Sequence, residues 1–428
     1  MEQSTQNSSP FSSFLKKGLF AAGATLLALS ASSAFAATAV TSFGSNPGAL
    51  KMYKHVPSAM PANAPLVVAL HGCTQTAAAY EASGWTALAN QHKFYVVYPE
   101  QQSANNQNKC FNWFEPGDIV RGQGETLSIK QMVDKMAADH SIDPSRVFVT
   151  GLSAGAYMVN VLAAAYPDVF AGAAPIAGGP YKCATSMTAA FSCMSPGTDK
   201  TPAAWGDLAR SGYSGYTGRK PRVSIWQGST DSTVKPMNMD ETMQQWTNYH
   251  GIDQTAEVSE SVAGFPHKVY KDASGNAIVE TYSITNMGHG TPVDPGTGAS
   301  QCGTAGAYIL DVNICSSYYI GQFFGIIGGD TGTTTTTSST SSTSNTSTSS
   351  TNTSSSGATT TTTTTTTIAG ACFNTSNYAH VTAGRAYNSA GYAKANGSNQ
   401  NMGLNNTFYK SKLRQTGTNY YVIDNTCP

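Results

Sequence analysis

A serine placed between two glycines is the part of this sequence best suited to covalent chemistry. Gly151-Leu152-Ser153-Ala154-Gly155 matches the pattern G-x-S-x-G, in which the serine lies on a sharp turn between a strand and a helix. The glycines let neighbouring chain segments approach closely, and the turn exposes the hydroxyl for attack on a carbonyl carbon. The pattern predicts Ser153 as a nucleophile.

A serine nucleophile needs a base and an acid, which follow it in the chain in the order acid, then histidine. Asp231 comes just after the apolar run Val223–Trp226, and His289 comes just after Ile278–Ile284. We expect His289 to take the Ser153 proton and return it to the leaving alcohol. Asp231 would fix the imidazole tautomer and stabilise its cation.

Other acids and bases in this part of the chain remain alternatives. Asp168 follows a predicted helix and Asp240 opens one, where carboxylates commonly interact with the helix end. His250 ends a helical stretch, and His267 lies in a predicted hairpin. The alternative acids are Asp168, Asp199, Asp207 and Asp240, and the alternative bases are His250 and His267.

The loop after an earlier strand should complete an oxyanion hole. His71-Gly72-Cys73 follows the apolar run Leu66–Leu70, which is the place from which such a loop usually donates an amide. We expect the backbone N–H groups of Cys73 and Ala154 to face the substrate oxygen. His71 is expected beside bound substrate, supporting the loop rather than transferring protons. The alternative is an ordinary turn at the end of a strand.

Aromatic residues after Cys110 are candidates for a substrate groove. The stretch Phe111–Phe114 contains Trp113, and a groove for an apolar substrate needs such surfaces. We therefore include Trp113 among the substrate-binding candidates. A tryptophan buried in the core is the alternative.

The elements that must position these residues alternate between strands and helices. Alternation of this kind predicts an α/β fold with a mostly parallel sheet and helices on both faces. Together with the G-x-S-x-G pattern at Ser153, it indicates the α/β-hydrolase type. Continuous apolar runs are typical of strands buried on both faces, and a stripe at helical spacing is typical of an amphipathic helix. The predicted strands are 66–70, 94–98, 146–150, 223–226 and 278–284, and the predicted helices are 128–140 and 154–166.

The N-terminus has the pattern of an export signal. Lys16 and Lys17 precede the apolar run Gly18–Leu29, and Ala34-Phe35-Ala36 fits a cleavage site, so residues 1–36 are expected to be removed. The alternative is a membrane anchor, but the run is shorter than the roughly 20 residues that a span needs. We expect a secreted, extracellular protein with no membrane partner.

Composition changes abruptly after Asp330. Residues 331–367 are almost wholly Thr and Ser, which cannot form a core and predict an extended, disordered linker. This separates a catalytic domain, residues 37–330, from a small module, residues 368–428. Because 24 basic residues offset 24 acidic ones and only 11% of the residues are charged, nothing favours a nucleic-acid partner. We expect a monomer.

Eight cysteines in an exported chain indicate disulfides. Proximity suggests the pairs Cys73–Cys110, Cys183–Cys193, Cys302–Cys315 and Cys372–Cys427, although eight cysteines allow 105 pairings. Zinc binding is the rival interpretation, and no C-x-x-C spacing supports it. The predicted chemistry implies neither a metal nor an organic cofactor.

These motifs together resemble the extracellular poly(3-hydroxybutyrate) depolymerases. They are most similar to those in which the histidine of the oxyanion loop, here His71, comes before the serine of the G-x-S-x-G pattern, which is called the lipase box and contains Ser153 here. The resemblance implies that Ser153, Asp231 and His289 form the triad and that Cys73 is an oxyanion donor. It also implies that the C-terminal module adsorbs to insoluble polyester while the tethered domain cleaves ester bonds. The matching segments are 71–75, 151–155, the Asp231 loop and 286–290, and in the module 372–381, 384–386 and 397–404.

Two other functions are compatible with the sequence. Esterases that act on acetylated or feruloylated xylan share similar catalytic elements, so the chain could be such an esterase with a carbohydrate-binding module. The module contains no tryptophan, which disfavours a polysaccharide surface. A surface adhesin built on an inactive hydrolase is the second alternative, against which the intact serine, acid and histidine argue.

Overall fold

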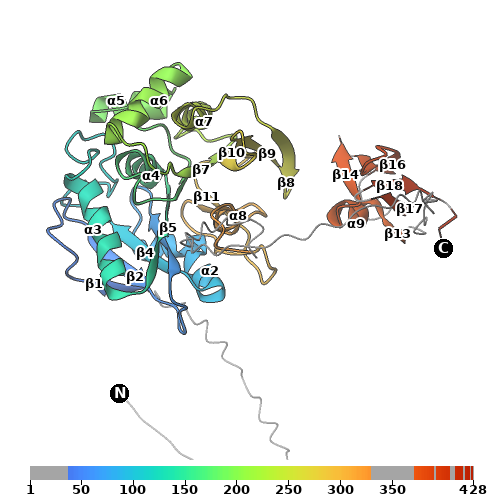
Figure 1. Ribbon diagram of the computed structural model, residues 1–428, viewed down its shortest axis with the longest axis horizontal. Coiled ribbons are helices and arrows are strands. Elements are labelled where there is room, and N and C mark those ends of the chain that lie inside the picture. The colour runs from blue at the N-terminus through green and yellow to red at the C-terminus, as the bar shows by residue number, and fades with distance from the viewer. Residues whose placement is uncertain are drawn as a thin grey trace, which may run out of the picture. The chain divides into compact units, whose positions relative to one another are not determined.

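The computed structural model describes residues 37–328 and, further on, residues 371–389, 392–404, 410–417, 420–424 and 426–427. The chain divides into two compact units, one within residues 1–335 and the other within residues 336–428 (Figure 1). The predicted export signal and the predicted Thr/Ser linker lie outside the described residues, so the boundaries proposed for them stay predictions. Within the described part, no helix combines the length and apolarity needed to cross a bilayer.

A ten-stranded sheet forms the centre of the first unit among its described residues. Its order is β1-β2-β4-β3-β5-β6-β7-β10-β9-β8. The six strands from β4 to β10 run parallel to one another, and antiparallel strands extend the sheet at both edges. The bounds are β1 Thr38–Val40, β2 Lys51–His55, β3 Ala64–Leu70, β4 Tyr95–Glu100, β5 Ile142–Leu152, β6 Gly172–Ile176, β7 Arg222–Gly228, β8 Val258–Val262, β9 Phe265–Lys271 and β10 Ala277–Ile284.

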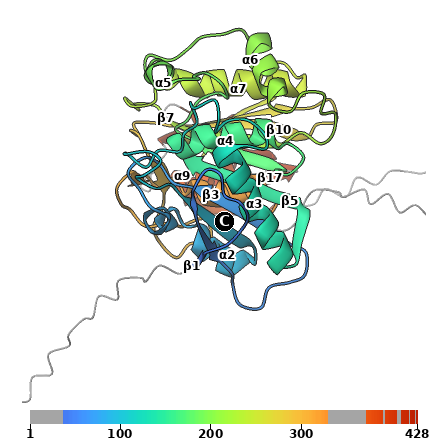
Figure 2. The same ribbon diagram turned by 90° about the vertical axis from the view of Figure 1, so that its left-hand side faces the viewer.

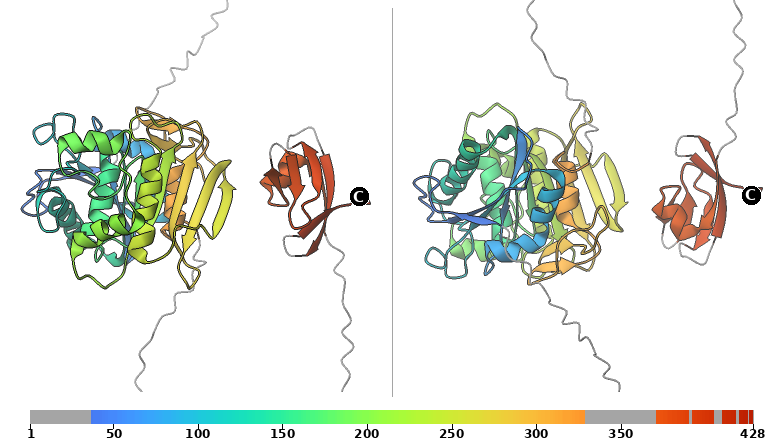
Figure 3. Two further views of the ribbon diagram at one scale, coloured as in Figure 1. Left: turned by 90° about the horizontal axis from the view of Figure 1, so that it is seen from above. Right: turned by 90° about the horizontal axis from the view of Figure 1, so that it is seen from below.

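Helices cover both faces of this sheet, as Figures 2 and 3 show. A short parallel pair, β11 and β12, lies outside it. The bounds are α1 Ala77–Tyr80, α2 Trp85–His92, α3 Gly124–Asp139, α4 Ala154–Ala165, α5 Met187–Met194, α6 Pro202–Arg210, α7 Met237–His250, α8 Ser316–Phe323, β11 Thr291–Val293 and β12 Ile309–Asp311, with 3₁₀ turns at Glu81–Ser83 and Ser211–Tyr213.

Alternation along β3 explains why the sheet needs two layers of helices. Leu66, Val68 and Leu70 pack into one hydrophobic cluster with α3, α4 and α7. Val67 and Ala69 point the other way, into a second cluster with α2 and α8. Successive side chains of a strand face opposite sides of the sheet, so a wholly apolar strand requires cover on both faces. The predicted α/β class, and each of the predicted strands and helices, is confirmed.

The second unit is much smaller. Its described strands form two antiparallel sheets of three strands each, in the orders β13-β17-β18 and β14-β15-β16. Their shared core consists of six buried residues, Ala386, Ala393, Ala395, Met402, Leu413 and Tyr421. The bounds are β13 Cys372–Ser376, α9 Asn377–Thr382, β14 Ala386–Ser389, β15 Tyr392–Ala395, β16 Asn401–Leu404, β17 Lys410–Gly417 and β18 Tyr420–Ile423.

All eight cysteines are paired, and the four pairings predicted from proximity are confirmed. Three disulfides belong to the first unit, and Cys372–Cys427 joins the two ends of the second. Each closes a loop within one unit, which limits the freedom of that segment in the unfolded chain.

Candidate active site

The chain turns sharply at Ser153, where β5 ends and α4 begins. Ser153 has φ 56° and ψ −119°, a backbone conformation that non-glycine residues adopt only under strain from their surroundings. A Cβ atom on Gly151 would lie 2.8 Å from the Leu70 carbonyl oxygen, and one on Gly155 would lie 2.6 Å from the same atom. The two glycines are therefore required by the close approach of β3, and the turn has the geometry of a nucleophile elbow.

Two neighbouring strands place an acid beside a histidine. β7 and β10 pair in parallel, so the loops that carry Asp231 and His289 leave the same edge of the sheet. His289 Nδ1 lies 2.7 Å from Asp231 Oδ2. The backbone N–H groups of Thr233 and Val234 donate to Asp231 Oδ1 over 2.8 and 2.9 Å. These bonds fix the carboxylate, which in turn fixes the imidazole.

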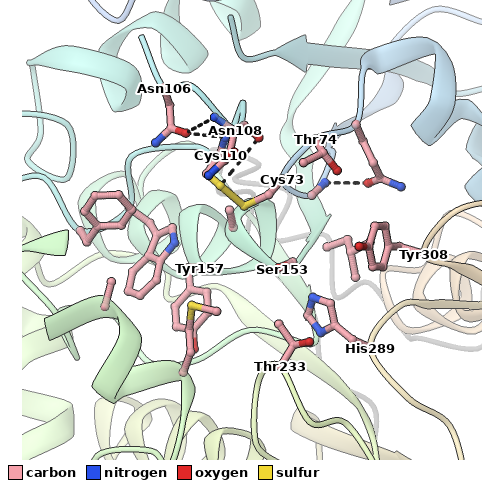
Figure 4. Close-up of a pocket in the computed structure, with 18 of the residues that line it drawn as sticks. Cys73, Thr74, Asn106, Asn108, Cys110, Ser153, Tyr157, Thr233, His289 and Tyr308 are labelled. Atoms are coloured by element: carbon pink, nitrogen blue, oxygen red, sulfur yellow. Dashed lines mark hydrogen bonds between the residues drawn. A yellow bond between two sulfur atoms is a disulfide. The ribbon is translucent and has the colours of Figure 1, made fainter. Parts of the chain in front are cut away.

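Ser153 and His289 face a common cavity of about 420 Å³, in which Figure 4 shows their side chains next to each other. Asp231 accepts a hydrogen bond from the Nδ1–H of His289. In the neutral ring, Nε2 is then left as the acceptor. The structure thus brings together the three predicted groups, a hydroxyl, an imidazole and a carboxylate. Such an arrangement can activate a hydroxyl for attack on an ester.

None of the alternative acids and bases is among the residues that line this cavity. Asp168 forms an ion pair with Arg121, with 2.7 Å between the charged atoms. His250 Nε2 lies 2.8 Å from the Pro221 carbonyl oxygen. His267 lies between Glu260 and Glu280, and these carboxylates raise its pKa against the opposing effect of burial. These three residues make their contacts outside the cavity that Ser153 lines.

The loop after β3 contributes Cys73 to the lining of the same cavity. The Cys73–Cys110 disulfide holds this loop, and the Thr74 N–H donates to the Asn108 carbonyl over 2.6 Å. The backbone N–H groups of Cys73 and Ala154 donate to no other described residue of the chain, and both residues line the cavity. Two free amides at this position can stabilise an oxyanion.

His71 does not line the cavity, and this corrects the expectation that it contacts substrate. Its side chain is fully buried. Nδ1 lies 2.7 Å from the Gly72 carbonyl oxygen, and Nε2 accepts a hydrogen bond from the Gln101 N–H over 3.1 Å. Burial lowers the pKa of His71 to about 4, so the ring is neutral. It supports the loop that contains Cys73 through its contacts with Gly72 and Gln101.

Three polar residues that the sequence analysis missed extend this support. Gln75 accepts from the Gly72 N–H over 2.8 Å and donates to the Ala307 carbonyl over 2.9 Å. Gln101 donates from its side chain to the carboxyl group of Glu125. Burial, and secondarily the charge of Asp118, raises the pKa of Glu125 to about 8. Only their positions near Cys73 and Cys110 could have pointed to Gln75 and Gln101, and no sequence signal marks Glu125.

Trp113 satisfies both interpretations that the sequence left open. The side chain is only 4% exposed, and its ring stacks on Tyr157 with 3.8 Å between centroids. It nevertheless lines the cavity. The stacked pair therefore forms a packed and fixed apolar wall.

Helix α5 supplies an apolar wall that the sequence analysis did not include. Met187, Phe191 and Met194 line the cavity, and Phe191 is 64% exposed. The pair Cys183–Cys193, which ties this helix to the preceding loop, was the one sequence signal near it.

The family model described as esterase PHB depolymerase matches residues 49–262. Poly(3-hydroxyalkanoate) depolymerase C of Paucimonas lemoignei is 77% identical over 317 residues, which cover 74% of this chain and 77% of that protein. The chain belongs to the esterase PHB depolymerase family. The predicted resemblance is confirmed, and the chain is a carboxylic ester hydrolase.

Relatives with lower sequence identity have names that refer to other esters. Feruloyl esterase B of Talaromyces funiculosus is 34% identical over 266 residues, covering 60% of this chain and 74% of that protein. The solved structure of an acetyl xylan esterase from Aspergillus awamori aligns with a TM-score of 0.58 at 30% identity, covering 68% of this chain and 99% of that one. The esterase fold is therefore shared beyond the depolymerases.

Proposed function

We propose that this chain hydrolyses the ester bonds of poly(3-hydroxybutyrate) and similar short-chain poly(3-hydroxyalkanoates) to oligomers and monomer. The observation that carries this proposal is the 77% identity to a poly(3-hydroxyalkanoate) depolymerase, set against 34% identity to a feruloyl esterase. The cavity beside Ser153, with Trp113, Phe114 and Tyr157 in its walls, suits an apolar polyester.

The proposed reaction runs through an acyl-enzyme. Ser153 Oγ attacks the ester carbonyl while His289 Nε2 takes its proton, and the Cys73 and Ala154 amides bind the oxyanion. The carbon–oxygen bond to the alcohol breaks as His289 protonates that oxygen. Water, deprotonated by His289, then attacks the acyl-enzyme, and the released Ser153 oxygen recovers the proton. Asp231 orients the imidazole and stabilises its cation.

The C-terminal module is proposed to adsorb to the insoluble polymer. Its described surface carries Tyr387 and Tyr420, which are 39% and 45% exposed, and aromatic faces suit a surface of methyl and carbonyl groups. The export-signal pattern and the four disulfides support an extracellular location. All proposed catalytic groups come from one chain, so the proposed working unit is a monomer.

Loss of turbidity from a suspension of poly(3-hydroxybutyrate) granules tests this function. We expect clearing of the granules and no appreciable release of acetate or ferulate from xylan esters run in parallel. Release of acetate or ferulate without clearing would replace the proposal with a xylan esterase.

A further inference from the structure

The cavity continues from Ser153 in two chemically different directions. Figure 4 shows Tyr157 and Tyr308 on opposite sides of Ser153, with His289 on the Tyr308 side. The Tyr308 ring lies 6.2 Å from the imidazole of His289 and is 49% exposed. On the other side, Trp113 stacks on Tyr157, and Cys193 of helix α5 lies beside the Tyr157 hydroxyl, with 3.7 Å between Sγ and the oxygen.

The proposed mechanism assigns a different half of the substrate to each direction. The carbonyl oxygen must face the Cys73 and Ala154 amides, and the leaving oxygen must face His289 Nε2, because this nitrogen protonates it. The alcohol portion then extends past His289 toward Tyr308. The acyl portion has the remaining direction, toward Tyr157 and α5.

Helix α5 turns one apolar stripe toward this second direction. Met187, Ala190, Phe191 and Met194 are spaced as i, i+3, i+4 and i+7, which places them on one face of a helix, and all four line the cavity. Phe191 and Met187 are 64% and 47% exposed. Water therefore covers these side chains until an apolar ligand replaces it.

The helix is held in place while its stripe remains free to contact substrate. The Cys183–Cys193 disulfide ties its last turn to the preceding loop. The Met194 carbonyl accepts a hydrogen bond from the Lys235 N–H over 2.9 Å, which connects the helix to the segment that follows Asp231. The unbranched thioethers of Met187 and Met194 adapt to an irregular apolar neighbour, whereas the rings of the stacked Trp113–Tyr157 pair are fixed.

We infer that α5 and the Trp113–Tyr157 pair form the acyl subsite, and that Met194 and Phe191 determine which acyl chains the enzyme accepts. Tyr308 forms part of the alcohol subsite. This inference rests on the proposed function for its chemistry, but it specifies the side of the scissile bond that each wall contacts. Its ligand is the alkyl branch and chain of the unit that acylates Ser153.

Two series of soluble esters separate the two subsites. The p-nitrophenyl esters of butyrate and octanoate differ only in the acyl chain, and ethyl and hexyl butyrate differ only in the alcohol. One methylene in an apolar pocket changes relative kcat/KM by about 10-fold or more. We expect Met194→Ala to widen the acyl subsite and raise the octanoate-to-butyrate ratio about tenfold. We expect Phe191→Ala, which removes a contact with the longer chain, to lower it.

The controls distinguish position from general damage. Tyr308→Ala should change the hexyl-to-ethyl ratio and leave the octanoate-to-butyrate ratio as it was. Met239 is half-buried like Met194 and packs against the same cluster, but it is absent from the cavity wall, so Met239→Ala should move neither ratio. Phe191 is exposed, so its variant tests the inference even if Met194→Ala does not fold.

The inference is overturned if the octanoate-to-butyrate ratio is unchanged in the α5 variants, or if Tyr308→Ala changes that ratio instead. These assays use no polymer. A failure to clear granules, combined with the expected shifts in ester selectivity, would therefore remove only the polymer assignment and leave the acyl subsite standing.

Discussion

The two units of this chain differ in the size of their core and in how far their functional residues are exposed. In the catalytic unit, Asp231 is 2% exposed and Ser153 is 9% exposed, and two large apolar clusters cover both faces of the sheet behind them. The C-terminal module has a core of six buried residues and displays Tyr387 and Tyr420. Catalysis depends on groups fixed to within about 1 Å, whereas adsorption depends on surface that remains accessible. Chemistry and adhesion should therefore be separable.

The largest expected effect is the loss of catalysis in Ser153→Ala. Removing the nucleophile of a triad reduces kcat by a factor on the order of 10⁴ or more, while adsorption to granules should be unchanged because the module is untouched. Ester hydrolysis and co-sedimentation with granules measure the two properties. Loss of both would mean that the units do not work independently.

Asp231→Asn should have the next largest effect. The asparagine can keep the position of the side chain but favours the wrong tautomer of His289, which reduces kcat by about 10⁴ in a triad. KM for a soluble ester should change little, because Asp231 does not face the substrate. A kcat within tenfold of the unaltered chain would remove Asp231 from the triad.

The module should depend on its disulfide more than the catalytic unit depends on any one of its own. Cys372 and Cys427 are 55 residues apart, and opening a loop of this length costs about 4 kcal/mol of unfolding free energy in the chain-entropy model. We expect the double serine variant to lose granule binding and keep the thermal transition of the catalytic unit. Retained binding would show that the small core suffices.

Removing residues 331–428 should affect solid substrate alone. Loss of a tethered binding site reduces local enzyme concentration at a surface by about 100-fold, so film degradation at limiting enzyme should fall by a similar factor. Hydrolysis of p-nitrophenyl butyrate should remain. Equal rates of film degradation by both forms would contradict the adhesive role of the module.

The effect expected to be smallest, counted per pH unit, concerns Glu125. Burial raises the pKa of this carboxyl group to about 8 from an ordinary value of 4.5. Between these pH values the folded state holds a proton that the unfolded state has released. Stability is therefore lost as pH rises through this window, by at most about 1.4 kcal/mol per pH unit. Glu125→Gln should remove this slope. Chemical denaturation at pH 5, 6, 7 and 8 would contradict this if the two proteins gave parallel profiles.

The parts of the site that sequence could predict are those set by local geometry. Ser153 follows from two glycines and a strand–turn–helix pattern, and Asp231 and His289 follow because parallel strands end at one sheet edge. Proximity also sufficed for the four disulfides, because each one joins two cysteines that follow each other in the chain. The family resemblance reached the substrate class because the motifs of both units pointed the same way.

Long-range contacts set the parts that sequence could not predict. Gln75 acts through Ala307, 232 positions away, and no local pattern encodes such a pairing. His71 looked like a substrate contact because it adjoins Cys73, but its ring turns inward toward Gln101. The stripe on α5 has helical spacing, yet only the fold shows that it faces Ser153 rather than the core.

Ser153 should be the nucleophile of an intact triad, and a fluorophosphonate probe tests this most directly. Such probes react with a serine only when a neighbouring base activates it. We expect one adduct, located on Ser153 by peptide mass spectrometry, with esterase activity falling in proportion to labelling. Activity that survives complete labelling, or an adduct on another residue, would contradict the account, and absence of any adduct would favour an inactive hydrolase that only adheres.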